Sequence, residues 1–326
     1  MEKLAREIIN GRRLNEEDDL AVFLHADLQE LQAGADMIRR ELCGNRVDLC
    51  CIINGRGGRC SEDCKFCAQS GHHATSCETY GFLETDAFVS DCKKMEAQGV
   101  DRYSIVTSGR MLAGADLDKA VASYSALHES CPDIKLCASH GLMTEANLKR
   151  LHEVGVTTYH TNLETSARFF PEICSTHTYE DKLEEIRRAR AAGMEICSGG
   201  IFGMGETWQD RFDMALLLSR LFVVSIPMNF LIPIKGTPLE GRPRLDREEI
   251  LRIVAIFRYF NPEAYIRIAA GRNYFPDGGR ELFCSGANAT LTGDMLTTVG
   301  NCTAQDREML KTMGFIIKEE KKDGRS

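Results

Sequence analysis

The sequence lacks the features that mark membrane, nucleic-acid-binding and secreted proteins. No apolar run approaches the roughly 18 residues of a membrane span, and residues 1–20 hold no uninterrupted apolar stretch of signal-peptide length. The formal net charge is −8 and no block of Lys and Arg stands out, which argues against a phosphate-backbone binder. We therefore expect a cytoplasmic protein with neither a membrane nor a nucleic acid as its partner.

Linkers are missing as well. No Pro/Gly/Ser-rich tract, repeat or low-complexity segment divides the 326 residues, and a hydrophobic content of 43% suffices for one large core. What the chain does contain is short β-rich runs that alternate with amphipathic helices. The expected strands are 49–54, 102–108, 134–139, 157–162, 194–199, 226–232, 264–270 and 281–287.

Eight strand-plus-helix units predict an α/β fold of the (β/α)8 TIM-barrel type. We expect the barrel to span 46–315, after N-terminal helices in 1–45 and before a solvated C-terminal tail at 316–326. In such a barrel the chemistry takes place in the loops after the strands. Candidate site residues are therefore sought at those strand ends.

Cysteine is abundant, with 14 residues. In a reducing compartment so many thiols indicate metal binding or catalysis rather than disulfides. Not all of them need a function, because a free cysteine also serves as a small apolar residue in a core. The cysteines without partner spacing, which we expect to be such filler, are Cys43, Cys77, Cys92, Cys131 and Cys174.

The stretch RCSEDCKFCAQS, residues 59–70, places Cys60, Cys64 and Cys67 in C-x3-C-x2-C spacing, with Phe66 before the last cysteine. A structural zinc site holds its ion with four protein ligands. Three thiolates on one loop can instead hold three irons of a cubane cluster and leave the fourth iron open. The stretch follows the first expected strand, where a barrel places its site.

A zinc alternative remains at this point, because His72 or His73 could supply a fourth ligand. In that case the chain would be a non-catalytic zinc- or cluster-bearing binding protein, and its surplus thiols would be structural.

The three-cysteine loop resembles that of the radical S-adenosylmethionine superfamily. The resemblance implies that Cys60, Cys64 and Cys67 hold a 4Fe–4S cluster with Phe66 beside the cofactor. The fourth iron would bind the amino and carboxylate groups of S-adenosylmethionine, which one electron cleaves to a 5′-deoxyadenosyl radical. A second motif of the superfamily, G-x-I-x-G-x-x-E beside the adenine, is matched by Gly199, Ile201, Gly203 and Glu206.

Longer stretches resemble the biotin synthase family, among them YHTNLETS, IPMNFLIPIKGTPLEG, YIRIAAGR and GANATLTGDMLTT. The resemblance implies a homodimer that inserts sulfur into dethiobiotin, with a donor such as flavodoxin or ferredoxin for single electrons. Asn162 and Glu164 match ribose-binding positions, and Asn229 matches the amide that binds the ureido ring. His160 stands where the family has Asn, so its substrate contact departs from the pattern.

The family also has an auxiliary iron–sulfur cluster, the sulfur donor, held by three cysteines and one arginine. Cys137, Cys197 and Arg267 match three of these ligands, but Ser104 stands in place of the expected cysteine on the second strand. Oxygen is a much poorer ligand for such a cluster than a thiolate. This chain therefore lacks one cysteine of the ligand set that is usual in the family.

We hypothesise that Cys50 replaces the missing ligand. Cys50 and Cys51 lie on the first strand, and alternation lets only one of the two face the barrel interior. Cys51, Cys284 or Cys302 are the other candidates, and surplus thiols would also fit a cluster larger than 2Fe–2S. Another radical S-adenosylmethionine enzyme, hydrogenase-cofactor maturase-like or amino-acid mutase-like, remains the alternative function.

Overall fold

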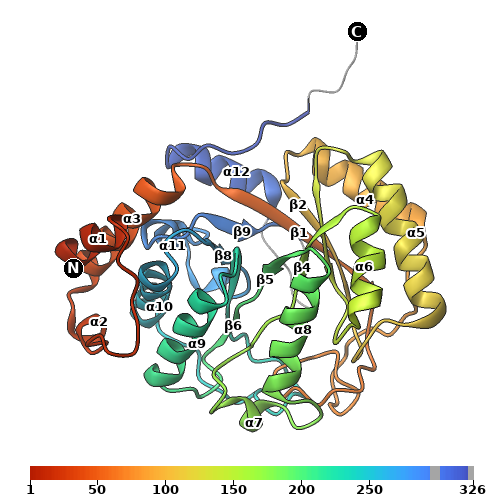
Figure 1. Cartoon of the computed structure of the whole chain (residues 1–326), viewed down its shortest axis with the longest axis horizontal. Helices are drawn as coiled ribbons and strands as arrows, with labels where there is room; N and C mark the ends of the chain where they lie inside the picture. The colour runs from red at the N-terminus through yellow and green to blue at the C-terminus, as the bar shows by residue number, and fades with distance from the viewer. Residues whose placement is uncertain (294–301, 322–326) are drawn as a thin grey trace.

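The computed structural model describes residues 1–293 and 302–321 and contains a closed parallel barrel, so the predicted (β/α)8 fold is confirmed (Figure 1). Neighbouring strands follow the order β5-β4-β3-β2-β1-β9-β8-β7-β6, and β5 also pairs with β7 to close the ring. β5 and β6 are two segments of one barrel position. The strands are β1 (Asp48–Arg56), β2 (Arg102–Thr107), β3 (Lys135–Ser139), β4 (Val156–His160), β5 (Glu195–Cys197), β6 (Gly200–Phe202), β7 (Ser225–Phe230), β8 (Tyr265–Ile268) and β9 (Ala289–Leu291).

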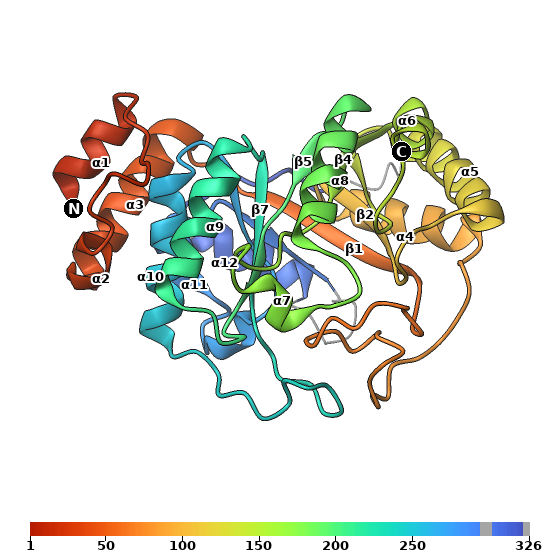
Figure 2. The ribbon, with the colours of Figure 1, turned by 60° about the horizontal axis from the view of Figure 1, so that its bottom comes forward.

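Helices surround the barrel, and three N-terminal helices pack at one side of it (Figures 1 and 2). The loops after β1 and after β7 extend at the same end of the barrel, the lower edge of Figure 2. No helix of the described residues is long and apolar enough to cross a bilayer. The helices are α1 (Glu2–Ile9), α2 (Val22–His25), α3 (Leu28–Cys43), α4 (Thr85–Ala97), α5 (Gly114–Ser130), α6 (Glu145–Glu153), α7 (Phe170–Ile173), α8 (Tyr179–Ala191), α9 (Trp208–Arg220), α10 (Arg247–Phe260), η1 (Arg272–Tyr274), α11 (Arg280–Cys284) and α12 (Thr303–Thr312).

Two helices that follow site loops begin at capping boxes. Thr178 accepts a hydrogen bond from the Asp181 amide at 3.1 Å, and Asp181 accepts one from the Thr178 amide at 2.8 Å. Thr207 and Asp210 repeat the arrangement at the start of α9. Each box satisfies amides that the first helical turn leaves unpaired. The chain before each helix, which carries site residues, is thereby fixed in place.

The eighth strand differs from the prediction. Residues 281–287 were expected to form it, but the structure has helix α11 there and places the strand at β9. Leu282 and Phe283 are fully buried. A short apolar run does not distinguish a strand from a buried helical turn, and this one follows Gly279, whose left-handed conformation starts the helix.

The C-terminal segment also differs from the prediction of a solvated tail. The Val47 amide donates to the Ile316 carbonyl at 2.9 Å, and Ile317 is buried. Lys321 pairs with Glu96 at 2.9 Å and with Asp133 at 2.8 Å. Residues 316–321 are therefore attached to the barrel beside α4, while 322–326 lie outside the described residues.

The N-terminal helices join the barrel through α3, which packs on α10 at a glycine. A Cβ on Gly34 would lie 1.8 Å from Tyr259 Oη and 3.0 Å from its Cζ. Only a residue without a side chain allows this approach of the two helices.

We expect Gly34→Ala to lower the free energy of unfolding by about 1–3 kcal/mol, the usual cost of overpacking. Tyr259→Phe removes the clashing oxygen, so Gly34→Ala should cost less in a Tyr259→Phe background. Chemical denaturation of the four proteins measures this difference. Gly81→Ala is the control, because nothing lies within 4 Å of its Cβ position; equal losses at positions 34 and 81 would contradict the packing argument.

Candidate active site

The loop after β1 folds back on itself and presents its three predicted cluster cysteines to one cavity. The Cys60 amide donates to the Gln69 carbonyl at 2.9 Å, and the Gly71 amide donates to the Cys60 carbonyl at 2.8 Å. The Cys67 amide donates to the Cys64 carbonyl at 2.9 Å. All three cysteines line a cavity of about 200 Å³. This set of soft sulfur donors on one loop fits an iron–sulfur cluster.

A second loop, residues 174–177, is clamped to the cysteine loop by two carboxylates. Asp63 accepts hydrogen bonds from the Ser175 amide at 2.9 Å and the Thr176 amide at 3.2 Å. Glu62 accepts from Thr176 Oγ1 at 2.9 Å and contacts His177 Nδ1 at 2.7 Å. Two segments more than 100 residues apart in sequence thus form one wall of the cavity.

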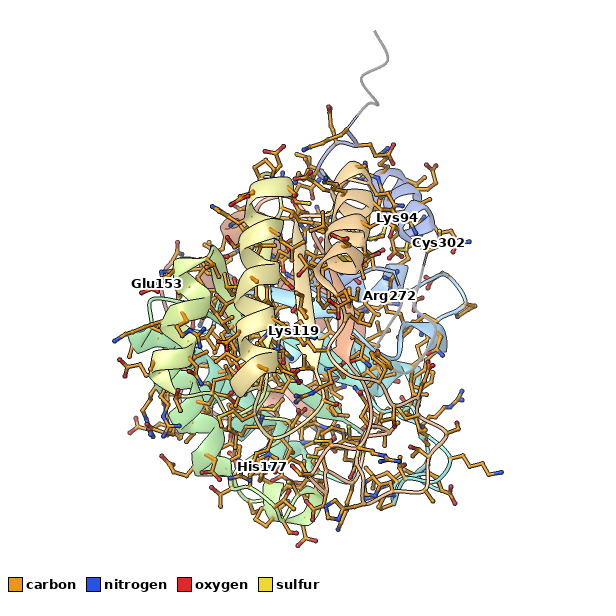
Figure 3. All side chains as sticks on the ribbon, turned by 90° about the vertical axis from the view of Figure 1, so that its right-hand side faces the viewer. Lys94, Lys119, Glu153, His177, Arg272 and Cys302 are labelled. Carbon is orange, nitrogen blue, oxygen red and sulfur yellow. The ribbon has the colours of Figure 1, made fainter. Side chains whose placement is uncertain are left out.

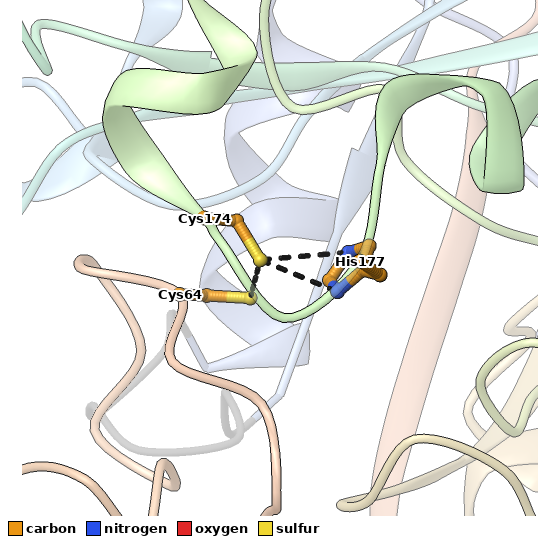
Figure 4. Close-up of side chains that lie close together, drawn as sticks. All are labelled: Cys64, Cys174 and His177. Carbon is orange, nitrogen blue, oxygen red and sulfur yellow. Dashed lines mark hydrogen bonds between the residues drawn. The ribbon is translucent and has the colours of Figure 1, made fainter.

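Cys174 was expected to be apolar filler, but it lies at this cavity. Its Sγ is 3.7 Å from Cys64 Sγ and 3.3 Å from His177 Nδ1 (Figure 4). The hydrogen bonds from Cys64 and His177 lower the pKa of Cys174 to about 4, against the desolvation that would raise it. The prediction missed this residue because its contacts are formed only by the fold.

His72 and His73 contact backbone carbonyls of the cysteine loop, and neither belongs to the group of metal-ligand side chains found among the described residues. His72 Nε2 contacts the Ser61 carbonyl at 2.9 Å, and His73 Nε2 contacts the Cys64 carbonyl at 3.0 Å. Their rings serve to fold the loop, and the zinc arrangement considered for them is not formed.

The ribose-pair positions, after β4, and the glycine-rich segment, at β5 and β6, lie side by side at neighbouring barrel positions. Asn162 Nδ2 donates to Glu164 Oε2 at 3.3 Å, and Asn162 Oδ1 accepts from the Gly199 amide at 3.0 Å. The Ile201 amide donates to the Glu164 carbonyl at 2.8 Å. Glu164 has a positive φ of 68°, unusual for a non-glycine residue. Burial raises the pKa of its carboxyl, which Lys182 opposes.

Glu206, the last residue of the glycine-rich motif, binds the backbone of the turn that precedes it. The Glu206 carboxylate accepts from the amides of Gly203, Met204 and Gly205 at 2.8, 2.9 and 3.1 Å. Arg211 pairs with it at 2.9 Å. The structure therefore gives Glu206 a role in shaping the turn, and it is Ile201 of this motif that lines a cavity.

A second cavity of about 310 Å³ occupies the barrel interior. Cys137 and Cys197 line it together with Arg267, and Cys50 and Ser104 do so as well. Burial raises the pKa of all three thiols, while the Arg267 charge lowers it. The interior thus brings together the side chains that the sequence assigned to the auxiliary cluster, and three thiols beside a cation form a donor set that fits such a cluster.

Cys51 points the other way. It packs in the core between strand and helix, where its Sγ lies 3.5 Å from the Arg102 carbonyl. Cys284 and Cys302 are exposed, on α11 and at the start of α12. In Figure 3, Cys302 lies at the upper right of the molecule and His177 in its lower part. Among the alternatives to Cys50, none lines the interior cavity.

The sequence analysis also missed Asp48, which lies two residues before Cys50. Its carboxylate pairs with Arg267 at 2.6 Å and with Arg102 at 3.1 Å, and all three side chains are buried. The two arginine charges lower the pKa of Asp48 against its desolvation. An acidic residue at the start of an apolar strand was the signal that could have revealed it, because a buried charge requires a partner.

The two cavities have walls in common. Phe66 and Glu164 line both of them. His160 and Asn162 line the interior cavity, as does Asn229, which also borders a third cavity of about 220 Å³. Residues predicted for S-adenosylmethionine and for substrate therefore lie between the cysteine loop and the interior thiols.

Comparisons with known proteins agree with this arrangement. Residues 56–218 match the model of the Radical SAM superfamily. The fold is shared with methylornithine synthase, at a TM-score of 0.83 and 20% identity over 97% of this chain and 98% of the other. The fold is shared also with HydG, a maturase of the [FeFe]-hydrogenase. The TM-score is 0.80 and the sequence identity is 19%, over 97% of this chain and 75% of HydG.

The chain is a radical S-adenosylmethionine enzyme, a class that uses a 4Fe–4S cluster and S-adenosylmethionine. Residues 227–316 also match the Biotin and Thiamin Synthesis associated domain. The chain is 61% identical to biotin synthase of Clostridium beijerinckii, over 97% of this chain and 100% of that protein. The chain is 56% identical to biotin synthase of Alkaliphilus metalliredigens, over 97% of this chain and 99% of that protein. The chain belongs to the biotin synthase family.

We expect Asp48→Asn to lower the free energy of unfolding by about 3–5 kcal/mol, because it leaves two buried guanidinium groups without their carboxylate. Urea denaturation of the protein without cofactors measures the effect. Asp118→Asn is the control: its ion pair with Arg150 is on the surface and should be worth less than about 1 kcal/mol. Similar midpoints for the two variants would refute the role of Asp48.

Proposed function

We propose that the protein converts dethiobiotin to biotin by radical insertion of one sulfur atom. The observation that carries the proposal is the pair of cavities, one lined by the thiols of the cysteine loop and the other by the interior thiols, with Phe66 and Glu164 in the walls of both. When bound, the 4Fe–4S cluster and S-adenosylmethionine supply a 5′-deoxyadenosyl radical, and the auxiliary cluster supplies the sulfur.

At the mouth of the barrel, Cys60, Cys64 and Cys67 would hold the 4Fe–4S cluster. Asn162 and Glu164 would bind the ribose of S-adenosylmethionine. Their hydrogen bonds to each other and to the glycine-rich segment support this role, since they hold both side chains at the wall of the interior cavity. A fixed wall keeps reacting groups at a constant separation.

The substrate would lie deeper, beside Asn229 and His160. Asn229 donates to the Gly200 carbonyl at 3.2 Å and accepts from the Ala270 amide at 3.3 Å. These are long hydrogen bonds, so the amide can exchange them for the ureido group. Desolvation by burial lowers the pKa of His160 to about 4, and its imidazole is therefore neutral at neutral pH.

The interior position would protect the reaction. A carbon radical must meet sulfur before water or another side chain supplies hydrogen, so the site must exclude solvent. Placement of substrate inside the barrel, between the two sets of thiols, provides this exclusion.

For the auxiliary cluster we propose Cys50, Cys137 and Cys197 as thiolate ligands, with Arg267 beside them. All three nitrogens of Arg267 already donate in the structure: Nε to Ser225 at 3.1 Å, Nη2 to Asp48 at 2.6 Å, and Nη1 to backbone carbonyls. To ligate iron, Arg267 would have to give up one of these contacts. This favours the thiol of Cys50 as the third sulfur ligand.

Three further proposals concern the setting of the enzyme. We propose a flavodoxin- or ferredoxin-type donor of single electrons, a homodimer, and a cytoplasmic location. All 14 cysteines are free thiols in the structure, which supports a reducing compartment. The proposals of the donor and of the dimer rest on the resemblance to the family alone.

The direct test uses anaerobically reconstituted full-length protein with a strong reductant, S-adenosylmethionine and dethiobiotin. We expect biotin and 5′-deoxyadenosine, both dependent on dethiobiotin. Cys64→Ala should lose both products because its cluster loses a ligand. Cleavage of S-adenosylmethionine without any biotin would contradict the proposal and favour a hydrogenase-cofactor maturase-like or amino-acid mutase-like enzyme.

Cys50→Ala should lower the iron and sulfide content of the reconstituted protein and remove the auxiliary-cluster component from its Mössbauer spectrum. Cys51→Ala is a matched control on the same strand with its side chain in the core, and it should retain that component. If the Cys50→Ala spectrum keeps an intact auxiliary signal, Cys50 is not a ligand.

A further inference from the structure

Cys64, Cys174 and His177 form a cluster of metal-binding side chains that the proposed function does not use as a unit. Their ligand atoms all lie within 4.8 Å of one another (Figure 4). Cys174 and His177 are buried, and Cys64 is partly so. Two thiols and an imidazole form a donor set that suits a zinc-type ion.

The spacing of the three groups fits one ion. At Zn–S and Zn–N bond lengths of about 2.3 and 2.0–2.1 Å, a tetrahedron places two sulfurs about 3.8 Å apart and a sulfur and a nitrogen about 3.6 Å apart. Cys64 Sγ and Cys174 Sγ are separated by 3.7 Å, and Cys174 Sγ and His177 Nε2 by 3.9 Å. Cys174 Sγ lies closer to Nδ1, at 3.3 Å, so the imidazole must turn before Nε2 faces an ion held by the two sulfurs.

A carboxylate orients the imidazole as in many metal sites. Glu62 Oε2 lies 2.7 Å from His177 Nδ1, so a proton shared there leaves the lone pair of Nε2 for a metal. Metal-binding histidines commonly donate their other nitrogen to a carboxylate in this way. Thr176 Oγ1 and Arg110 Nη1 contact the same Glu62 oxygen at 2.9 and 3.2 Å, which fixes its position.

The loop that carries Cys174 is also held before any metal arrives. Asp63 accepts from the amides of Ser175 and Thr176 and from the Ser175 hydroxyl, and its Oδ1 lies 3.3 Å from Cys174 Sγ. The loop that carries Cys174 therefore needs little reordering on binding, which lowers the entropic cost, and the movement required is that of the His177 ring.

We propose that, while the 4Fe–4S cluster is absent, Cys64, Cys174 and His177 bind one divalent ion of the zinc type. Cys64 is shared with the proposed cluster site, so the single ion and the cluster exclude each other. An ion bound here delays cluster assembly until it is removed.

The test is a cobalt(II) titration of full-length protein kept reduced and freed of iron and sulfide. Cobalt reports tetrahedral geometry through its visible bands, and thiolate number through the intensity of charge transfer. We expect one equivalent with two thiolates. Cys174→Ala should weaken binding by more than about 100-fold, and Glu62→Gln by about 10–100-fold, the range for loss of a carboxylate behind a histidine ligand.

Cys77→Ala is the matched control, because Cys77 is on the same loop and its thiol contacts only the Glu78 carbonyl among the described hydrogen bonds. It should bind cobalt as the unchanged protein does. If Cys174→Ala binds with unchanged affinity and three thiolates, the ion uses Cys60, Cys64 and Cys67, and the proposal is overturned. Absence of stoichiometric binding would overturn it too.

A second measurement tests the competition. Protein loaded with one equivalent of zinc should form its cluster more slowly than metal-free protein when iron and sulfide are added, and Cys174→Ala should show no such delay. Equal rates with and without zinc in the unchanged protein would refute the exclusion. Neither experiment uses S-adenosylmethionine or dethiobiotin, so its failure leaves the proposed function untouched.

Discussion

One buried carboxylate, Asp48, joins the strands around the interior cavity. It pairs with Arg102 of β2 and Arg267 of β8, and its own backbone is aligned with β9. A guanidinium group inside a barrel needs a counter-charge, and Asp48 is the buried carboxylate that both arginines share; the more exposed Glu195 lies 3.9 Å from Arg102. Because strand residues alternate in direction, a strand that turns Asp48 inward also turns Cys50 inward.

The arrangement of side chains at the mouth of the barrel depends on a break in the fifth strand position. β5 ends at Cys197 and β6 begins at Gly200. Within this break the Gly199 amide is free of regular strand pairing and donates to Asn162 Oδ1 at 3.0 Å. A Cβ on Gly199 would lie 2.0 Å from the Pro227 carbonyl oxygen. The glycines of this segment thus allow a close approach that positions Asn162 and Glu164 between the two cavities.

Much of this architecture could be predicted from the sequence. Seven of the eight strand positions follow from apolar runs, and the cysteine spacing identifies the loop that lines the outer cavity. The eighth strand was missed because residues 281–287 are as apolar in a helical turn as in a strand. Cys174 and Asp48 were missed for another reason: their partners are distant in sequence. The acidic residue in an apolar strand signals that Asp48 needs a partner, but a linear pattern does not say which residue that is.

The same distance explains what the fold adds to the cysteine loop. Cys64 and Cys174 are 110 residues apart and come together only because Glu62 and Asp63 fasten the second loop to the first. The three thiols of the loop alone offer one arrangement of ligands, which suits a cubane cluster. The thiol of Cys174 and the imidazole of His177 add a second arrangement, which suits a single metal ion. Because one sulfur belongs to both geometries, the same carboxylates that make the loop rigid also make its two possible occupants compete.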